Sequence, residues 1–277
     1  MSGADPAGGA KEKETPSILT KAFDVLNAFN QNERVMTLSQ LARASGLPKS
    51  TVHRLLARLV EFGAIEHHRS GYKLGLGLLQ LGATTPAAKM RDQAIPYLVA
   101  LQRWTRQTVT FAVLREFDVV YLEKLAPADS PSTLVSIGAR LPSNCTAIGK
   151  ALLSYEDLDD LAAFLPLRLH QMTPHSITNA DDLVEHLRIV RKEGIAREHN
   201  EAQMGLEGVA APVVVNGFAV GAIAINHGPN APASGRVDAA LRDTTAQLSA
   251  HLRSYVVAAP EGERLVPRTL SDPPPWG

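Results

Sequence analysis

The chain has 277 residues, of which 45% are hydrophobic, and its 28 basic and 28 acidic side chains give it no net charge. A chain of this length can bury a substantial core and favours two domains over one. Its single cysteine excludes an internal disulfide and a cysteine-rich metal site. The first residues lack the apolar stretch of a leader peptide, and no run of about 18 apolar residues predicts a membrane span. We therefore expect a cytoplasmic protein that has no membrane partner.

The charge is unevenly distributed along the chain. Residues 34–73 carry seven basic and two acidic side chains, whereas the rest of the chain carries 21 basic and 26 acidic ones. This opposition of sign favours an anionic partner for the N-terminal part. A basic face that is merely solvated is the alternative.

The N-terminal part is expected to be helical after a short arm. Residues 1–16 are rich in Gly, Ala, Lys and Glu and have no apolar periodicity, so we expect them to be disordered. Helical spacing of apolar residues from Ser17 predicts a first helix. Thr37 suits the N-cap of a second helix, and Gly46 can end that helix in a left-handed conformation.

A third helix and a hairpin complete the predicted domain. Pro48 suits the start of the helix because its fixed φ is already helical and it has no N–H to leave unpaired. One face is apolar, with Val52 and Leu56, and the opposite face is small, polar and cationic. The run "AIEHHRSGYKLG" then alternates like a β-hairpin with its turn at Ser70-Gly71. These elements form a winged helix-turn-helix, which we place at residues 17–77.

The polar face of the third helix predicts DNA binding. Lys and Arg neutralise phosphates, and short side chains allow a helix to enter a major groove. For Arg58, a phosphate contact or simple solvation is favoured over base reading, and for His53 a surface histidine is the alternative. The candidate DNA-binding residues are Lys49, Ser50, Thr51, His53, Arg54, Arg58, Arg69 and Lys73.

A linker and a second domain follow. Residues 78–91 are interpreted as a linker helix and a break, and residues 92–257 as an α+β domain with one antiparallel sheet. Residues 258–277 are expected to form a disordered tail. The first helix of the domain is expected to be amphipathic, with Ile95, Leu98, Leu101 and Trp104 on its apolar face. The strand-like runs are 109–116, 119–126, 133–141, 208–215 and 218–226, and a final helix is expected over 236–256.

Small and large residues alternate in the last two strand-like runs. Ile223 and Ile225 share one face of their strand, and Ala222 and Ala224 share the other, with the polar Asn226 at its edge. Small residues that face a common side, together with a few polar groups, favour a pocket for a small molecule. Close packing of a helix on the small residues is the alternative.

Several of these segments resemble one known family. The runs "SILTKAFDVLNAF", "LSQLARASGLPKSTVHRLLARLVEFGAIE" and "YKLGLGLLQLG", followed by "GARLPSNCTAIGKALLS" and "EGIAREHNEAQMGLEGVAAPVVV", closely resemble the IclR family of bacterial transcriptional regulators. The resemblance covers about residues 17–257. It implies a GAF-like α/β effector-binding domain, and subunits that pair through the linker helix.

The resemblance also implies an effector site between the sheet and the loops around the last two runs. Better-known members carry Cys or Ser at three of the matching positions, which are Gly208, Ala224 and Asn226 here. Fewer hydroxyls and a roomier wall predict an effector that is bulkier or more apolar than a two- or three-carbon acid. The matching positions in this sequence are Ala147, Ile148, Glu198, Gly208, Ala224 and Asn226.

Catalysis, cofactors and metals are not indicated. Around the run "AIGKA" (147–151), Asn144 and Ala151 stand where a phosphate-binding loop needs Gly and Ser or Thr. Lys150 is therefore expected in solvent or in a local pair on its helix. Cys145 has no second thiol for redox chemistry, and the histidines lack the spacing of a zinc site. We expect no enzyme, no cofactor and no metal.

The sequence therefore predicts a ligand-responsive transcriptional regulator of a catabolic or metabolic operon, whose effector class includes aromatic metabolites. Its partners are expected to be double-stranded operator DNA with an inverted repeat, a small-molecule effector and a second copy of the chain, in a homodimer or a dimer of dimers. The alternative is a metabolite-binding or redox module whose helix-turn-helix is a protein-contact surface.

Overall fold

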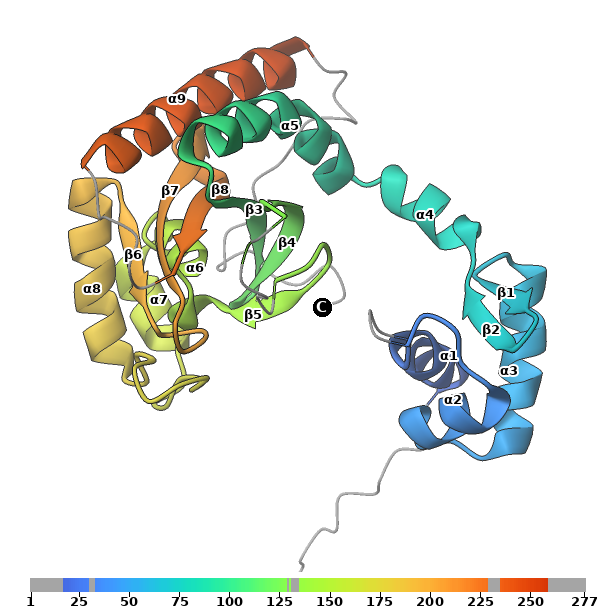
Figure 1. The fold of residues 1–277 in the computed structure, drawn as a ribbon. Helices are drawn as coiled ribbons and strands as arrows, with labels where there is room; N and C mark the ends of the chain where they lie inside the picture. Colours follow the sequence, from blue (N-terminus) through green and yellow to red (C-terminus); the bar gives the residue numbers. More distant parts are fainter. Residues whose placement is uncertain (1–16, 30–32, 129, 131–134, 229–234, 259–277) are drawn as a thin grey trace, which may run out of the picture. The chain divides into compact units, whose positions relative to one another are not determined.

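The computed structural model describes residues 17–29, 33–128, 130, 135–228 and 235–258. The chain divides between Thr85 and Pro86 into two compact units (Figure 1). The arm expected at residues 1–16 and all but the first residue of the tail expected at 258–277 lie outside the described residues.

The first unit has the elements of a winged helix. Thr37 begins the second helix with a capping box, in which its hydroxyl accepts from the N–H of Gln40 and its own N–H donates to the Gln40 side chain. Gly46 ends that helix with φ 67°, as predicted. In chain order the elements are α1 (Ile18–Asn27), α2 (Leu38–Ser45), α3 (Lys49–Glu61), β1 (Ile65–His68), β2 (Gly71–Leu74) and α4 (Leu76–Ala83).

One small core holds the first three helices and the hairpin together. This core is a single cluster of buried residues that includes Val25, Leu41, Val52 and Leu56, each at most 1% exposed. Ile65 of β1 belongs to the same cluster. The apolar face predicted for α3 therefore points inward, and its polar face is left outside.

The hairpin turn lies one residue earlier than predicted. His68 pairs with Gly71, so the turn residues are Arg69 and Ser70. Gly71 belongs to β2, where a Cβ would lie 2.4 Å from the carbonyl oxygen of Met36. Met36 exchanges two backbone hydrogen bonds with Tyr72, of 2.9 and 2.8 Å, so the glycine permits the chain before α2 to lie against the hairpin.

The second unit is built on a six-stranded antiparallel sheet. The strand order is β5-β4-β3-β8-β7-β6, which joins two three-stranded meanders through the pairing of β3 with β8. Its elements are α5 (Pro86–Thr105), β3 (Thr108–Arg115), β4 (Asp118–Leu125), β5 (Arg140–Pro142), a 3-10 turn (Ser143–Cys145), α6 (Ala147–Leu153), α7 (Leu158–Phe164), α8 (Ala180–Glu193), β6 (Ala196–His199), β7 (Glu207–Val215), β8 (Phe218–His227) and α9 (Gly235–Ala258).

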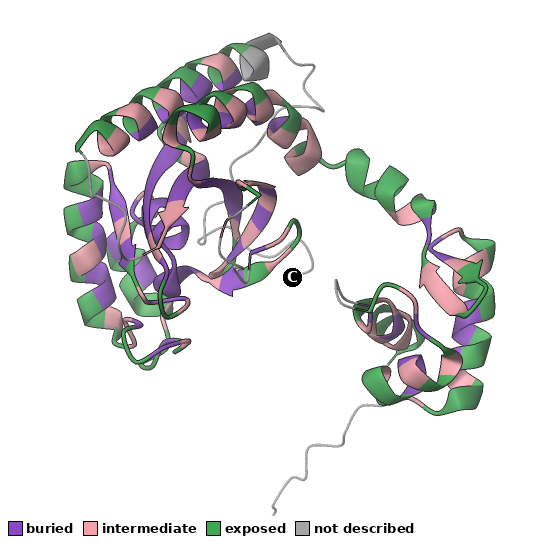
Figure 2. Ribbon diagram, in the orientation of Figure 1, coloured by how far each residue is buried: buried purple, intermediate pink, exposed green. Residues whose placement is uncertain are grey.

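Helices cover both faces of the sheet (Figure 1). On one face, α5 and α9 pack on the large residues of the strands, including Phe111, Val213 and Ile223. On the other face, α6 packs on alanines, which include Ala210 and Ala222. The most deeply buried residues accordingly follow the strands (Figure 2). The division into large and small faces confirms the alternation predicted for β7 and β8.

Three predictions for the second unit were wrong. Trp104 is 56% exposed, although Leu98 and Leu101 of the same expected face are buried; α5 begins at Pro86 and also buries Met90 and Ala94. Residues 86–91 of the expected linker are therefore the first turns of α5. The strand expected over 133–141 is reduced to β5, since residues 135–139 are turns and irregular chain and 133–134 lie outside the described part. β6 and α7 were not predicted.

Candidate DNA-binding surface and effector site

The outward face of α3 presents its polar side chains to solvent. Lys49, Ser50, His53 and Arg54 are exposed, and Thr51 is half-buried. Within the described residues, the side chains of Lys49 and Arg54 make no hydrogen bond or ion pair, so both cations are available to a ligand. Packing of Val52 and Leu56 in the core sets the direction of this face.

Two of the expected DNA-binding cations are already engaged. Arg58 donates to Glu61 one turn along α3, at 2.7 Å. Lys73 lies opposite Glu66 in the hairpin, and its Nζ is 2.8 Å from that carboxylate. The N–H of Leu76 also donates to Glu66, at 3.0 Å, so the Glu66–Lys73 pair fixes the start of α4 on the hairpin. The hydrogen bond from Lys73 holds the pKa of Glu66 below its usual range.

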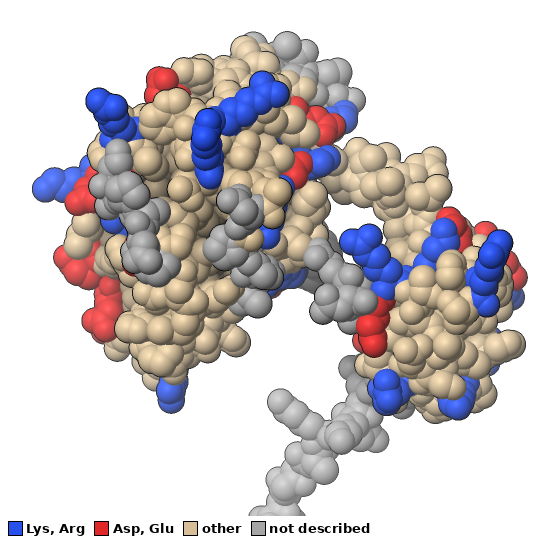
Figure 3. Space-filling view, viewed as in Figure 1, with Lys and Arg blue, Asp and Glu red and all other residues tan. Residues whose placement is uncertain are grey.

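Arg69 lies apart from α3, in the turn of the hairpin, and is exposed. Arg43, in the last turn of α2, is a further exposed cation that was not among the candidates. Arg43 is one of the seven basic residues of the segment 34–73. Its position just before the turn to α3 is the signal that could have identified it as a DNA-binding candidate. Figure 3 shows Lys and Arg side chains at several places on the surface of this unit.

The expected effector residues of the second unit gather at one end of the sheet, on the face covered by α6. The hydroxyl of Thr110 donates to Asn226 at 3.3 Å. Gly208 pairs with Asn226 across the strands, and a Cβ at residue 208 would lie 2.7 Å from the Asn226 amide nitrogen. The room expected from Gly208 is therefore filled by Asn226, and the wall is not roomier at this position.

Glu198 connects this end of the sheet to α6. Its side chain is 2% exposed, and its two oxygens accept from the N–H groups of Ala147 and Ala202, each at 3.2 Å. Burial raises the pKa of Glu198 to about 7, because these two hydrogen bonds do not offset the loss of water. Burial and the nearby Glu198 charge also raise the pKa of Tyr121 above its usual range.

The remaining two candidates lie in a close helix-to-sheet contact. Ile148 and Ala224 are 1% and 2% exposed and belong to the cluster between α6 and the alanine face. A Cβ on Gly149 would lie 2.2 Å from the carbonyl oxygen of Ser143, so α6 also packs tightly on the turn before it. Close packing, the alternative to a pocket, therefore explains these small residues, and the polar groups at the strand ends are left as the effector candidates.

The expectation for Lys150 was wrong. Its side chain is fully buried, and its Nζ lies 2.7 Å from both oxygens of Glu201, which is 51 residues away in the sequence. All seven residues of α6 are buried, so the helix has no polar face from which a lysine could reach water. Cys145 is also fully buried, where its thiol donates to the carbonyl of His170 at 3.4 Å, and burial raises its pKa.

Comparison with known proteins identifies both units. The model of the IclR helix-turn-helix domain matches residues 18–69, and that of the bacterial transcriptional regulator IclR C-terminal domain matches residues 83–273. The chain belongs to the IclR family. It is therefore a transcriptional regulator with a DNA-binding helix-turn-helix and an effector-binding domain, as the sequence predicted.

Individual IclR relatives agree with this assignment. The HTH-type transcriptional regulator KdgR of Dickeya chrysanthemi is 30% identical over 210 residues, which cover 73% of this chain and 68% of KdgR. The regulator XynR of Escherichia coli is 30% identical over 197 residues, or 70% of this chain and 78% of XynR. An IclR homolog from Microbacterium hydrocarbonoxydans, solved in complex with 4-hydroxybenzoate, has a TM-score of 0.78 at 25% identity and covers 86% of this chain and 100% of its own.

These IclR relatives are regulators rather than enzymes. Among the residues that the structure describes, no group of three or more His, Cys, Asp or Glu side chains is placed to hold a metal ion. In the same part of the chain, none of the helices combines the length and apolarity needed to cross a bilayer.

Proposed function

We propose that this IclR-family regulator binds an inverted-repeat operator as a homodimer or a dimer of dimers, and that a small organic acid, aromatic acids included, changes its DNA affinity. The observation that carries the proposal is the outward face of α3, on which Lys49 and Arg54 are exposed and unpaired within the described chain. Lys49 at the start of the helix suits a phosphate contact, and Arg54 suits a base edge.

A second copy of the chain is supported by apolar side chains that the first unit leaves exposed. Leu76, Leu79 and Leu81 of α4 are 68–72% exposed, and Leu19 and Phe23 of α1 are 69% and 62% exposed. Leucines this exposed on one short helix favour burial against a partner. One helix-turn-helix reads few base pairs, so two copies also give the specificity that an operator requires.

The effector site is proposed at the polar end of the alanine face, around Asn226, Thr110 and Glu198. A related IclR protein binds 4-hydroxybenzoate, and a benzoate combines an apolar ring with a carboxylate and a hydroxyl. Asn226 offers both a donor and an acceptor to such groups. Metabolite control of a catabolic or metabolic operon follows if the effector binds one arrangement of the units better than another.

A gel-shift titration on DNA upstream of the protein's own gene, at two salt concentrations, tests the DNA-binding half. We expect Arg54→Ala to weaken specific binding by about 1–3 kcal/mol, or roughly 5- to 150-fold in Kd. Arg103→Ala removes the same charge from an exposed position on α5 in the other unit and is expected to change little. Unchanged affinity in Arg54→Ala would show that this face of α3 is not the one that enters the groove.

The effector half is tested in the same titration with benzoate, 4-hydroxybenzoate and short aliphatic acids. We expect one acid to shift the DNA affinity, and Asn226→Leu to abolish that shift while DNA binding persists. If the response survives in Asn226→Leu, the effector binds somewhere other than this end of the sheet. Binding that does not depend on salt would favour the protein-contact alternative, since counterion release accompanies contacts to phosphates.

A further inference from the structure

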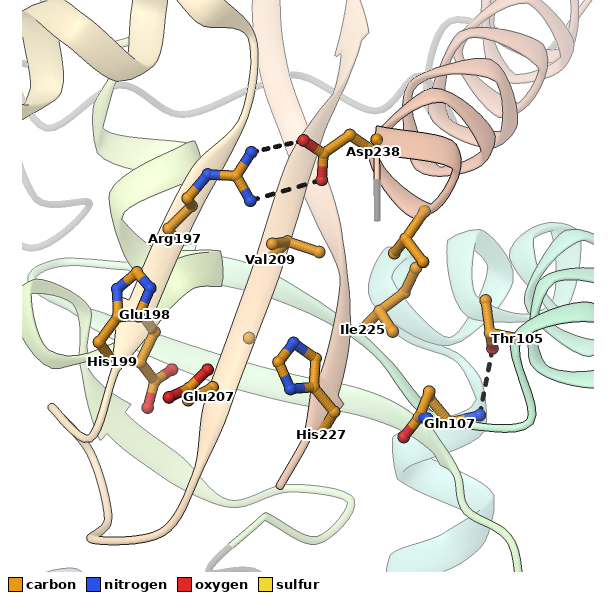
Figure 4. Close-up of a pocket in the computed structure, with 13 residues that line it drawn as sticks. Thr105, Gln107, Arg197, Glu198, His199, Glu207, Val209, Ile225, His227 and Asp238 are labelled. Atoms are coloured by element: carbon orange, nitrogen blue, oxygen red, sulfur yellow. Dashed lines mark hydrogen bonds and ion pairs between the residues drawn. The ribbon is translucent and has the colours of Figure 1, made fainter. Parts of the chain in front are cut away.

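A cavity of about 450 Å³ lies on the face of the sheet opposite to α6 (Figure 4). It is bordered by the ends of β6, β7 and β8, by the first turn of α9, and by the junction between α5 and β3, which contributes Thr105 and Gln107. A volume of this size suits a small organic molecule. Glu198 and Gly208 also border the cavity. The side chains of Glu198 and Asn226 make their hydrogen bonds on the α6 face, so the cavity and the proposed effector site lie on opposite faces of the sheet.

Strand register determines which side chains line the cavity. Arg197, Val209 and Ile225 lie opposite one another on β6, β7 and β8. One pair further along, His199, Glu207 and His227 form a second row. Because residues two apart share a face, both rows face the same side as α9. Val209 and Ile225 of the first row supply an apolar floor, and the second row supplies a polar end.

The charged side chains that line the cavity differ in whether they already have a partner. Arg197 forms a two-point ion pair with Asp238 in the first turn of α9, so its charge is compensated inside the wall (Figure 4). Nδ1 of His227 is 2.9 Å from the carbonyl oxygen of Gly228. The carboxylate of Glu207 makes no hydrogen bond or ion pair within the described part of the chain, although it is half-buried at the cavity.

We propose that this cavity is a second ligand site, and that it binds a small organic cation: an amine whose ammonium group pairs with Glu207 and whose hydrocarbon part lies on Val209 and Ile225. An uncompensated carboxylate beside apolar floor residues favours a cationic head group on an apolar body. A carboxylic acid is disfavoured, because Arg197, the one arginine among the described residues that line the cavity, is already neutralised by Asp238.

The histidines narrow the class of ligand further. His199 and His227 flank Glu207 on the neighbouring strands, so an aromatic or planar ligand could stack on an imidazole ring while its ammonium group contacts the carboxylate. A metal ion is disfavoured, because these three side chains are not among any metal-competent group within the described residues.

Calorimetric titration of the full chain with 2-phenylethylamine and with 3-phenylpropionate tests the site, since the two probes share a ring and differ in charge. We expect the amine to bind and Glu207→Gln to weaken it at least tenfold. Gln107→Phe fills the cavity from its rim without removing a charge and is expected to abolish binding. Glu116→Gln, which removes an exposed carboxylate from the turn between β3 and β4, is the matched control and is expected to leave binding unchanged.

Asn226→Leu separates this proposal from the effector site on the other face, because it should leave amine binding intact while the response to acids is lost. Absence of heat with the amine, equal binding of the acid, or an unchanged affinity in Glu207→Gln would overturn the proposal. Each of these outcomes leaves the proposed operator binding and its control by an acid untouched.

Discussion

Removal of Glu201 is expected to destabilise the second unit strongly. Lys150 is fully buried, and both of its short contacts, of 2.7 Å, go to Glu201, which is itself 7% exposed. Glu201→Ala would leave an ammonium group in the core without its counter-charge. Breaking a buried pair in this way costs about 3–5 kcal/mol. Domains are stable by only about 5–15 kcal/mol, so much of the unit's stability would be lost.

Urea unfolding followed by far-UV circular dichroism at fixed protein concentration measures this loss. The double variant Lys150→Met/Glu201→Leu replaces the pair by apolar side chains and is expected to recover most of the stability, because desolvation of both charges is then avoided. Glu185→Ala breaks an exposed pair with Arg188 on α8 and is expected to change stability little. If Glu201→Ala cost no more than Glu185→Ala, the ammonium group of Lys150 would not be buried as the structure has it.

Two further variants test the packing and charge of α6. Gly149→Ala should lower the thermal unfolding temperature, because its Cβ would lie 2.2 Å from the Ser143 backbone and overpacking costs about 1–3 kcal/mol. The control is Gly82→Ala in α4, which has open space around its Cβ and should not lower the unfolding temperature. Glu198 holds its proton more tightly when folded, with a pKa of about 7 against 4.5, so stability should fall by about 3 kcal/mol as pH rises from 4.5 to 7. Glu198→Gln should remove this pH dependence, and a slope that persists would assign it to another group.

The winged helix could be predicted because its signals are local. A cap at Thr37, a left-handed end at Gly46 and an apolar stripe on α3 each involve residues a few positions apart. The hairpin turn was misplaced by one residue because Gly71 was assigned to the turn, whereas its role is a close approach to Met36, a distant contact that the run itself does not reveal.

The second unit was less predictable because its elements depend on contacts between distant segments. β6 is only four residues long and is defined by its pairing with β7. The partner of Lys150 lies 51 residues away. The sequence did contain one signal that Lys150 is buried and paired. The helix sequence AIGKALL has no polar face, and a helix that is apolar all round is buried. A lysine in such a helix therefore needs a buried partner.

The proposed acidic effector would act on the contacts between α6 and the neighbourhood of β6. α6 is tied to β6 by the hydrogen bond from Ala147 to Glu198, and to the segment after β6 by the pair of Lys150 with Glu201. An effector carboxylate that approached the Ala147 N–H would meet the Glu198 carboxylate already bonded there, and two like charges cannot share that amide at low cost. Glu198 must then take up a proton or leave α6. Either event weakens the contact between α6 and β6, while the Lys150–Glu201 pair still holds α6 to the segment after β6.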